Sequence, residues 1–333
     1  MSFPDSDPRI LTLKHWLQQQ LKLEIHSLEA ASSDASFRRY FRVIHTGGCQ
    51  IVMDAPPDKE NTEPFIRIAQ LFATAELHVP VIYAINQEQG FLLLEDLGSQ
   101  CLLDQLNQTN VDSRYQAALN SLFKLQTRIN SLESGLAAYD QALLSRELGI
   151  FNDWFVEKQL GLRLPIEVQS SLYELLINSA LEQPQVVVHR DFHSRNLMLL
   201  DNDSPGIIDF QDAVVGPICY DLVSLLRDCY VSWPAAQVEN WLYNYYLRLI
   251  DAQLVTVDFN IFKRWFDLIG LQRHLKAVGI FSRLHWRDNK SGYLADIPRT
   301  LDYIAAIAGS YPELSLFNNF LHQQLLPAYQ TNL

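Results

Sequence analysis

Three oxygen-bearing side chains in the second half of the chain have types and spacing that suit phosphoryl transfer. Asp191 ends the run His-Arg-Asp, Asn196 follows five residues later, and Asp209 opens an Asp-Phe pair. In this known pattern one carboxylate orients the acceptor hydroxyl and takes its proton, while an amide and a second carboxylate hold magnesium. Mg²⁺ prefers hard oxygen ligands of this kind. The pattern therefore predicts Asp191 as the catalytic base, and Asn196 and Asp209 as metal ligands.

Short apolar segments around these residues predict the strands that position them. Residues 186–188 are a valine run and predict a buried strand that delivers Asp191 to a loop. A second strand is expected over 196–200, with a turn through 201–206 and a return at 207–208. We therefore expect the three oxygen-bearing side chains to meet at one end of a hairpin.

Two other interpretations of these residues remain open. On a continuous strand, His189, Asp191 and His193 would alternate onto one face and make a transition-metal site of the kind that hydrolases use. Alternatively, His189 and Asp209 are satisfied polar groups in a core hairpin. The first leaves Asn196 unexplained, and the second would bury charge at a cost of several kcal/mol.

Composition and charge exclude several classes of protein. A chain of 333 residues forms one large domain or two smaller ones, and its net charge of −12 argues against nucleic acid and anionic membrane partners. No apolar run reaches the roughly 20 residues that span a bilayer. The N-terminus does not resemble a signal peptide, and the four cysteines form no Cys-x-x-Cys pair, which indicates a reducing cytoplasm. Nothing indicates an obligate protein partner.

The first hundred residues read as a small sheet with helices. Ser-rich, Gly-Gly and Pro-containing turns separate segments whose apolar residues alternate or recur at helical spacing. The elements expected, in order, are a helix over 9–23, a short strand before the Ser-rich loop at 32–37, strands at 39–44 and up to 54, a helix from Asn61 or Thr62 to 76, and strands at 80–84 and 91–95.

Several segments carry a resemblance to a known superfamily. LLLEDLG at 92–98 and DFQDA at 209–213 resemble the hinge and metal-binding motifs of the aminoglycoside phosphotransferase and choline kinase superfamily. The outer segments resemble, more specifically, bacterial kinases of the anomeric hydroxyl of N-acetylmuramate and N-acetylglucosamine. These segments are SDASFRRYFRV, MDAPPDKE, GPICYDLVSLLRDCY at 216–230 and RHLKAVGIFSRL at 273–284.

The resemblance implies an α+β fold with the two lobes of a protein kinase. Residues 1–97 would form a small antiparallel-sheet lobe that ends in the hinge, and 98–333 a large, mainly helical lobe with the catalytic loop and substrate site. ATP and Mg²⁺ are the implied cofactors, with adenine on the backbone of Glu95 and Leu97 and His193 near the transferred phosphate. The implied products are sugar 1-phosphates for peptidoglycan recycling. An aminoglycoside or amino alcohol kinase, or a weakly catalytic nucleotide-binding regulator, remains an alternative.

The small lobe lacks the lysine that usually pairs with the nucleotide phosphates, since Met53 and Asp54 stand in its place. The loop over 32–37 should cover the phosphates through backbone N–H groups, with Ser36 among them, although it contains no glycine. We expect at least one of three nearby arginines, Arg38, Arg39 and Arg42, to supply the missing charge. The alternative is that these arginines only form a solvated strand edge.

Beyond residue 98 the apolar periodicity is helical, through 115–129, 166–181, 238–249 and 262–281. Acidic and aromatic side chains in this region suit a sugar, because carboxylates bind hydroxyls and an aromatic face packs on the ring. Asp221 begins a helix and is interpreted as its cap. The predicted substrate contacts are Glu147, Trp154, Arg227, Asp228 and Arg273. Arg227, Arg273 or Lys276 would suit the lactyl carboxylate of N-acetylmuramate.

Overall fold

The structure is a computed structural model, and it describes residues 7–33, 37–200 and 204–331. The chain divides into two compact units. The first unit comprises Met1–Ser121 and Arg195–Asp212, and the second comprises Leu122–Ser194 and Ala213–Leu333. The predicted division into lobes after residue 97 stays a prediction.

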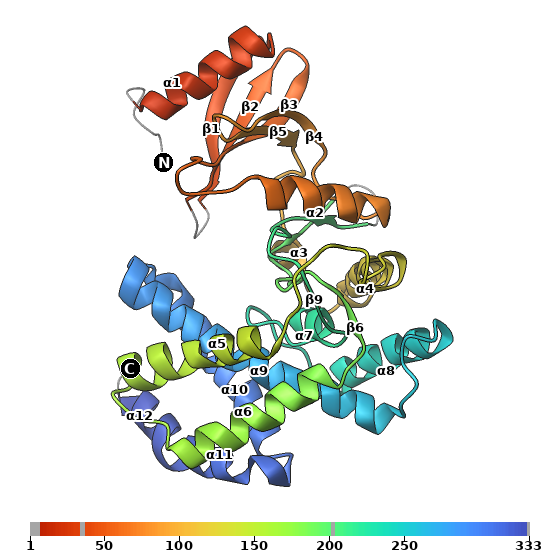
Figure 1. Cartoon of the computed structure of the whole chain (residues 1–333), viewed down its shortest axis with the longest axis vertical. Coiled ribbons are helices and arrows are strands. Elements are labelled where there is room, and N and C mark those ends of the chain that lie inside the picture. Colours follow the sequence, from red (N-terminus) through yellow and green to blue (C-terminus); the bar gives the residue numbers. More distant parts are fainter. Residues whose placement is uncertain (1–6, 34–36, 201–203, 332–333) are drawn as a thin grey trace. The chain divides into compact units, whose positions relative to one another are not determined.

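The first unit is built on a five-stranded antiparallel sheet with strand order β1-β2-β3-β5-β4 (Figure 1). β2 and β3 form a tight hairpin in which His45 pairs with Gly48, and Gly48 has the positive φ of 131° that such a turn requires. The expected strands are confirmed as elements of this sheet. Their bounds are β1 Ile25–Ser33, β2 Arg39–His45, β3 Gly48–Asp54, β4 Ile82–Asn86 and β5 Phe91–Glu95.

An opening helix covers one face of this sheet (Figure 1). α1 Pro8–His15 is capped by the Asp7 side chain and continues as a π-helical turn, η1 Trp16–Gln20. Its apolar side packs on the alternating residues Phe41 and Val43 of β2, which therefore point away from the opposite face. The core on this side consists of Ile10, Leu13, Trp16, Leu17, Phe41, Val43, Val52, Phe91 and Leu93.

The first unit also contains helices and a second hairpin. Phe210 follows the hairpin, is fully buried, and packs on Phe65 and Phe72 of α2 at centroid distances of 4.8 and 5.8 Å. These aromatic contacts fix the chain immediately after Asp209. The elements are α2 Glu63–Thr74, α3 Leu102–Gln105, the hairpin β7 Leu197–Met198 and β8 Gly206–Ile207, and α4 Val111–Arg128, which continues into the second unit.

The second unit is mainly helical and is organised around the 30-residue α9 Phe259–Asp288. Most of α9 is buried, because α5, α6, α7 and α10 all pack on it. At Gly279 a Cβ atom would lie 2.6 Å from the Ile150 carbonyl group, so only glycine permits this approach. The other helices are α5 Gln141–Ile150 with its π-helical extension η2 Phe151–Gln159, α6 Ile166–Leu181, α7 Tyr220–Leu226, α8 Ala235–Asp251, α10 Ile297–Ala308, α11 Ser315–Phe320 and α12 Leu326–Thr331, with short turns η3 Ser291–Asp296, η4 Pro312–Leu314 and η5 Leu321–Leu325.

A two-stranded antiparallel ribbon in the second unit precedes and follows the loop that contains Asp191. β6 Gln185–Val188 pairs with β9 Val214–Pro217, in the register Val188 to Val214. The predicted strand over 186–188 is confirmed, but its partner strand was missed. The fold class, an antiparallel sheet unit with a mainly helical unit, agrees with the α+β prediction. Within the described residues, no helix is long and apolar enough to cross a membrane.

Candidate active site

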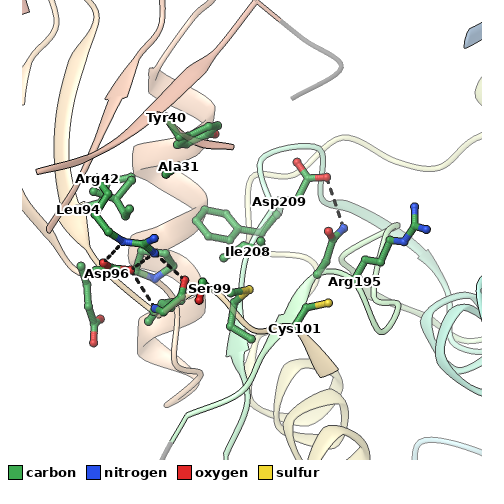
Figure 2. Close-up of a pocket in the computed structure, with 18 of the residues that line it drawn as sticks. Ala31, Tyr40, Arg42, Leu94, Asp96, Ser99, Cys101, Arg195, Ile208 and Asp209 are labelled. Atoms are coloured by element: carbon green, nitrogen blue, oxygen red, sulfur yellow. Dashed lines mark hydrogen bonds and ion pairs between the residues drawn. The ribbon is translucent and has the colours of Figure 1, made fainter. Parts of the chain in front are cut away.

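The first unit contains a cavity of about 390 Å³. One wall is the face of the sheet opposite α1, where Tyr40 and Arg42 alternate with the core residues of β2. Figure 2 shows Arg42 and Asp96 on one side of this cavity and Asp209 on the other. We call it the hinge cavity, because the segment 95–98 lines it.

The hinge segment is fixed at both ends and leaves the Leu97 backbone donor available. The Glu95 N–H donates to the Val81 carbonyl at 2.8 Å, and the Glu95 side chain accepts from the Val81 N–H at 3.2 Å. Gly98 has a positive φ of 86°, so the chain turns there in a conformation that favours glycine. In the described part of the chain the Leu97 N–H has no hydrogen-bond partner. The predicted adenine contact at Leu97 therefore has a free donor.

A two-pronged ion pair ties the hinge to β2. Arg42 Nε donates to Asp96 Oδ2 at 2.6 Å, and its Nη2 donates to Asp96 Oδ1 at 2.9 Å and to the Gly98 carbonyl at 3.0 Å. The Cys49 thiol donates to the same carboxylate at 3.0 Å. The hydrogen bonds from Arg42 lower the pKa of Asp96 to about 2. The positive charge of Arg42 is thus already bound within the cavity wall.

Asn196 and Asp209 flank the β7–β8 hairpin and face each other. Asn196 Nδ2 lies 3.4 Å from Asp209 Oδ2, and Gln211 Nε2 donates to Asp209 Oδ1 at 2.7 Å. Asp209 adopts a left-handed backbone with φ of 63°, a strained conformation that clusters at functional sites. One carboxylate and one amide oxygen suit Mg²⁺, which keeps several waters and phosphate oxygens as its other ligands. The two predicted metal ligands are therefore brought together.

The transition-metal alternative assumed a strand that the structure does not contain. β6 ends at Val188, so His189, Asp191 and His193 lie in a loop without strand alternation. Across the described residues, no cluster of three or more His, Cys, Asp or Glu side chains is arranged to hold a metal ion.

The predicted phosphate-charge residues of the small sheet lie in different places. Arg39 points to the α1 face, where it binds Asp54 through Nε at 2.9 Å and Asp7 through Nη1 at 2.5 Å. Asp54 also accepts a hydrogen bond from Arg9 and is fully buried. Arg38 is half-buried, and its predicted role in nucleotide binding stays a prediction. Ser36 lies outside the described residues.

In the second unit, a buried carboxylate holds the loop that follows β6. Asp221 accepts from the His189 N–H at 2.6 Å and the Arg190 N–H at 3.0 Å, and Arg190 has a positive φ of 77°. Asp221 is therefore not the cap of α7, which begins after Cys219, because both of its oxygens bind the loop. Burial raises the pKa of Asp221 to about 7, against these two N–H donors.

A second carboxylate holds the other end of this loop. Asp228 Oδ2 accepts from the Ser194 N–H at 2.9 Å and from the Ser194 hydroxyl at 2.5 Å, while its Oδ1 accepts from the Tyr230 N–H at 2.9 Å. Asp228, predicted as a substrate contact, thus anchors the loop. The interval between His189 and Ser194, which contains Asp191, is fixed at both ends.

Asp191 itself is half-buried in a cationic surrounding. Burial raises its pKa, but Lys276, His193 and Arg273 lower it by more, so the pKa is below its ordinary value. The carboxylate is therefore ionised at neutral pH and able to accept a proton. The His193 ring stands edge-on to Tyr230 with a centroid distance of 5.2 Å.

Asp191 and His193 line a cavity of about 90 Å³ within the second unit, which we call the loop cavity. Its other walls come from residues within 220–230 and from α9. These are the two segments, 216–230 and 273–284, that carried the resemblance to anomeric sugar kinases. The remaining lining residues are Tyr220, Cys229, Tyr230, Arg273, Lys276, Ala277, Ile280 and Phe281.

Glu147 was predicted to contact substrate and instead lies in a buried network behind this cavity. Its Oε1 binds Lys276 Nζ at 2.8 Å and the Arg190 guanidinium, and its Oε2 accepts from the Tyr139 hydroxyl. Burial raises the pKa of Glu147, and the cations Lys276 and Arg190 outweigh that effect and lower it. Lys276 also lies 3.3 Å from the Tyr220 hydroxyl. Glu147 therefore neutralises and positions two cations.

The remaining predicted substrate residues lie away from the described lining of the loop cavity. Arg227 binds Asp267 at 2.6 Å and lies over the Phe266 ring at 4.6 Å. Trp154 is half-buried in η2. Their substrate roles stay predictions. Sequence reasoning missed Tyr220 and Tyr230 as lining residues, although both lie in a segment that carried the resemblance.

Comparisons with known proteins identify the family. The phosphotransferase enzyme family matches residues 27–252. The chain belongs to this family. An N-acetylmuramate/N-acetylglucosamine kinase of Pseudomonas putida is 45% identical over 327 residues, covering 94% of this chain and 95% of the relative. A kinase of the same name from Pseudomonas aeruginosa is 45% identical, covering 87% of this chain and 86% of the relative.

Solved structures share the fold of this family member. The ADP-bound crystal structure of aminoglycoside phosphotransferase APH(2'')-Ib is 17% identical, with a TM-score of 0.57, and the match covers 89% of this chain and 98% of that one. This likeness confirms the protein-kinase-like fold. The family match identifies the chain as a phosphotransferase.

Proposed function

We propose that this phosphotransferase moves the γ-phosphoryl group of ATP to the anomeric hydroxyl of N-acetylmuramate and N-acetylglucosamine. The products are the sugar 1-phosphates, which serve peptidoglycan recycling. The observation that carries this proposal is the 45% identity, across 94% of the chain, to a kinase named for both sugars. Because the reaction consumes ATP and the described cysteines are unpaired, we also propose a cytoplasmic location.

The hinge cavity is the proposed nucleotide site. The free Leu97 N–H suits a ring nitrogen of adenine, with a backbone group of Glu95 beside it. Asn196 and Asp209 are the proposed magnesium ligands, because they present an amide and a carboxylate to each other at the edge of this cavity. When bound, Mg²⁺ neutralises charge on the phosphate oxygens. Ser36, Arg38 and His193 remain the proposed phosphate contacts from the sequence.

Asp191 is the proposed catalytic base. Its pKa is below the ordinary value, so it is ionised but only weakly basic. An anomeric hydroxyl is more acidic than an ordinary alcohol, so a weak base within hydrogen-bond reach suffices to take its proton. The hydrogen bonds of the Asp221 and Asp228 carboxylates to the loop support this role, because they fix the backbone on both sides of Asp191.

The alternative substrates fit the loop cavity less well. A polycationic aminoglycoside favours an acidic site, whereas Arg273 and Lys276 line this cavity beside the single carboxylate Asp191 among its described residues. A choline-like cation meets the same objection. A non-catalytic regulator does not require the fixed loop and the Asn196–Asp209 pair.

A substrate panel tests the proposal. The purified protein is assayed with magnesium-ATP against N-acetylmuramate, N-acetylglucosamine, kanamycin and choline, and phosphorus NMR then locates the transferred phosphate. We expect turnover of both N-acetylated sugars with phosphate on the anomeric oxygen. Preference for kanamycin or choline, or phosphate on the 6-hydroxyl, contradicts the anomeric assignment, and ATP binding without turnover supports the regulator.

A further inference from the structure

Arg273 differs from the other buried cations around the catalytic loop. Its side chain is 6% exposed and lines the loop cavity with Asp191. Among the described residues its one hydrogen-bond partner is the sulfur of Cys229, 3.6 Å from Nη1, and no carboxylate oxygen lies within ion-pair distance. A thiol is a weak acceptor, so this guanidinium is buried with most of its donors unused by the protein.

The neighbouring buried cations each form an ion pair with a carboxylate of the protein. Lys276 and Arg190 share Glu147, and Arg227 binds Asp267 at 2.6 Å. Burying a charge without a partner is unfavourable, so such a group commonly marks a site that a ligand completes. Burial lowers the pKa of Arg273, but Cys229, Tyr220, Asp228 and Asp191 raise it by more, so the group stays cationic.

The rest of the loop cavity narrows the chemistry of that ligand. Tyr220, Tyr230 and Phe281 provide aromatic surface, and Asp191 provides the base beside the hydroxyl that reacts. A planar guanidinium matches a carboxylate through two parallel hydrogen bonds. The acceptor therefore fits best if it carries an anionic group on the side facing α9.

We propose that Arg273 binds the carboxylate of the acceptor and is the residue that makes the enzyme favour N-acetylmuramate over N-acetylglucosamine. This inference rests on the proposed sugar kinase function. The proposal assigns different roles to two cations that line the same cavity. Arg273 binds the negative charge of the substrate, whereas Lys276 is neutralised by Glu147 and affects both sugars equally. The competing explanation is that Arg273 stabilises the transferring phosphoryl group, which both sugars receive.

The test compares kcat/KM for N-acetylmuramate, for its neutral lactyl amide and for N-acetylglucosamine, in the parent enzyme and in Arg273→Gln. The acid and the amide have nearly the same size, so their ratio isolates the carboxylate. We expect the parent to prefer the acid over the amide by about 10- to 100-fold, the range of a buried charge-assisted contact. In Arg273→Gln this ratio should fall close to one, while Arg273→Lys should retain part of it.

Lys276→Gln is the matched control, because it removes a cation from the same helix face and should leave the acid-to-amide ratio unchanged. Calorimetric titration of each sugar and a thermal melt accompany the assays, so a misfolded variant is recognised and Arg273→Lys then carries the comparison. Equal losses on acid, amide and N-acetylglucosamine in Arg273→Gln overturn the proposal in favour of the phosphoryl role. If the parent handles both N-acetylated sugars without distinguishing acid from amide, the Arg273 proposal alone is overturned. If the parent neither binds nor phosphorylates them, the proposed function fails with it.

Discussion

The hinge cavity and the loop cavity use arginine in opposite ways. Arg42 lines the cavity of about 390 Å³ and is bound through two prongs to Asp96, so its charge is satisfied within the protein. Arg273 lines the cavity of about 90 Å³ and has a thiol as its protein partner among the described residues. The first arrangement fixes a wall, and the second leaves a charge available to a ligand. Both are lining arginines, and only their partners distinguish them.

The carboxylates Asp96 and Asp221 also differ in whether a charged partner lies against them. Arg42 lowers the pKa of Asp96 to about 2. Burial raises the pKa of Asp221 to about 7, because in the described residues Asp221 accepts from backbone N–H groups and has no cation at ion-pair distance. The hinge is held by charge, and the catalytic loop is held by hydrogen bonds to a buried acid. Variants that remove one group at a time test this contrast.

The largest effect is expected from Asp191→Asn. An amide cannot accept the proton of the acceptor hydroxyl, so turnover should fall roughly 10²- to 10⁴-fold. Nucleotide affinity, which we propose depends on the hinge cavity, should stay close to that of the parent. Steady-state kinetics and a nucleotide titration measure the two quantities. Asp153→Asn, at an exposed carboxylate, is the control, and near-parental turnover in a folded Asp191→Asn would remove Asp191 from the role of base.

The second effect in size is expected from Asp209→Ala. The variant removes the carboxylate of the proposed metal pair and leaves Asn196 and Gln211 without their shared acceptor. Productive magnesium-ATP binding and activity should fall together by about 10²-fold, because phosphate charge is then uncompensated. Raising the magnesium concentration should rescue activity only in part. A parental dependence on magnesium would show that Asp209 is structural.

Most of the fold could be predicted from local pattern. Alternating apolar residues and Gly or Pro turns predicted all five strands in the large sheet, and the periodicity over 262–281 lies inside α9 Phe259–Asp288. β9 Val214–Pro217 was missed because a short apolar run does not by itself indicate a strand or its pairing partner. That partner is β6, which lies before the β7–β8 hairpin in the sequence. The π-helical turns η1 and η2 were missed because residue periodicity does not distinguish them from α-helix.

The candidate site could be predicted only as far as motif spacing reaches. Asn196 and Asp209 were predicted as metal ligands from their match to a known motif. The structure brings their side chains together, and their metal role stays a prediction. The roles of charged residues depend on partners distant in sequence, as Glu147 shows through Lys276, 129 positions away by the two residue numbers. From the sequence, Asp228 was likewise predicted to line the substrate cleft. Only the structure shows that it accepts hydrogen bonds from Ser194.

A smaller effect, on nucleotide affinity, distinguishes the two faces of β2. In Arg42→Ala, the Asp96 carboxylate loses its guanidinium and the Gly98 carbonyl loses its donor, so the hinge loosens and nucleotide affinity should fall about tenfold. Arg39→Ala is the matched control, because Arg39 points to the α1 face and binds Asp54. It should lower the melting temperature while changing nucleotide affinity by less than about twofold. Equal affinity losses in both variants would contradict the assignment of faces.

The smallest effect concerns the pH dependence of stability through Asp221. Its pKa is about 7 in the folded protein and about 4 in an unfolded chain, so between these values the folded state binds more protons. Its contribution to the free energy of unfolding is therefore fully present below about pH 4 and is lost as the pH rises through about 7. Asp221→Asn keeps one acceptor for the loop N–H groups and does not titrate. Urea unfolding at a series of pH values should show the advantage of the parent over Asp221→Asn shrinking from pH 4 to pH 7. An advantage that grows over this range would mean that the two N–H donors outweigh burial and hold Asp221 ionised, so that both carboxylates are controlled by their partners.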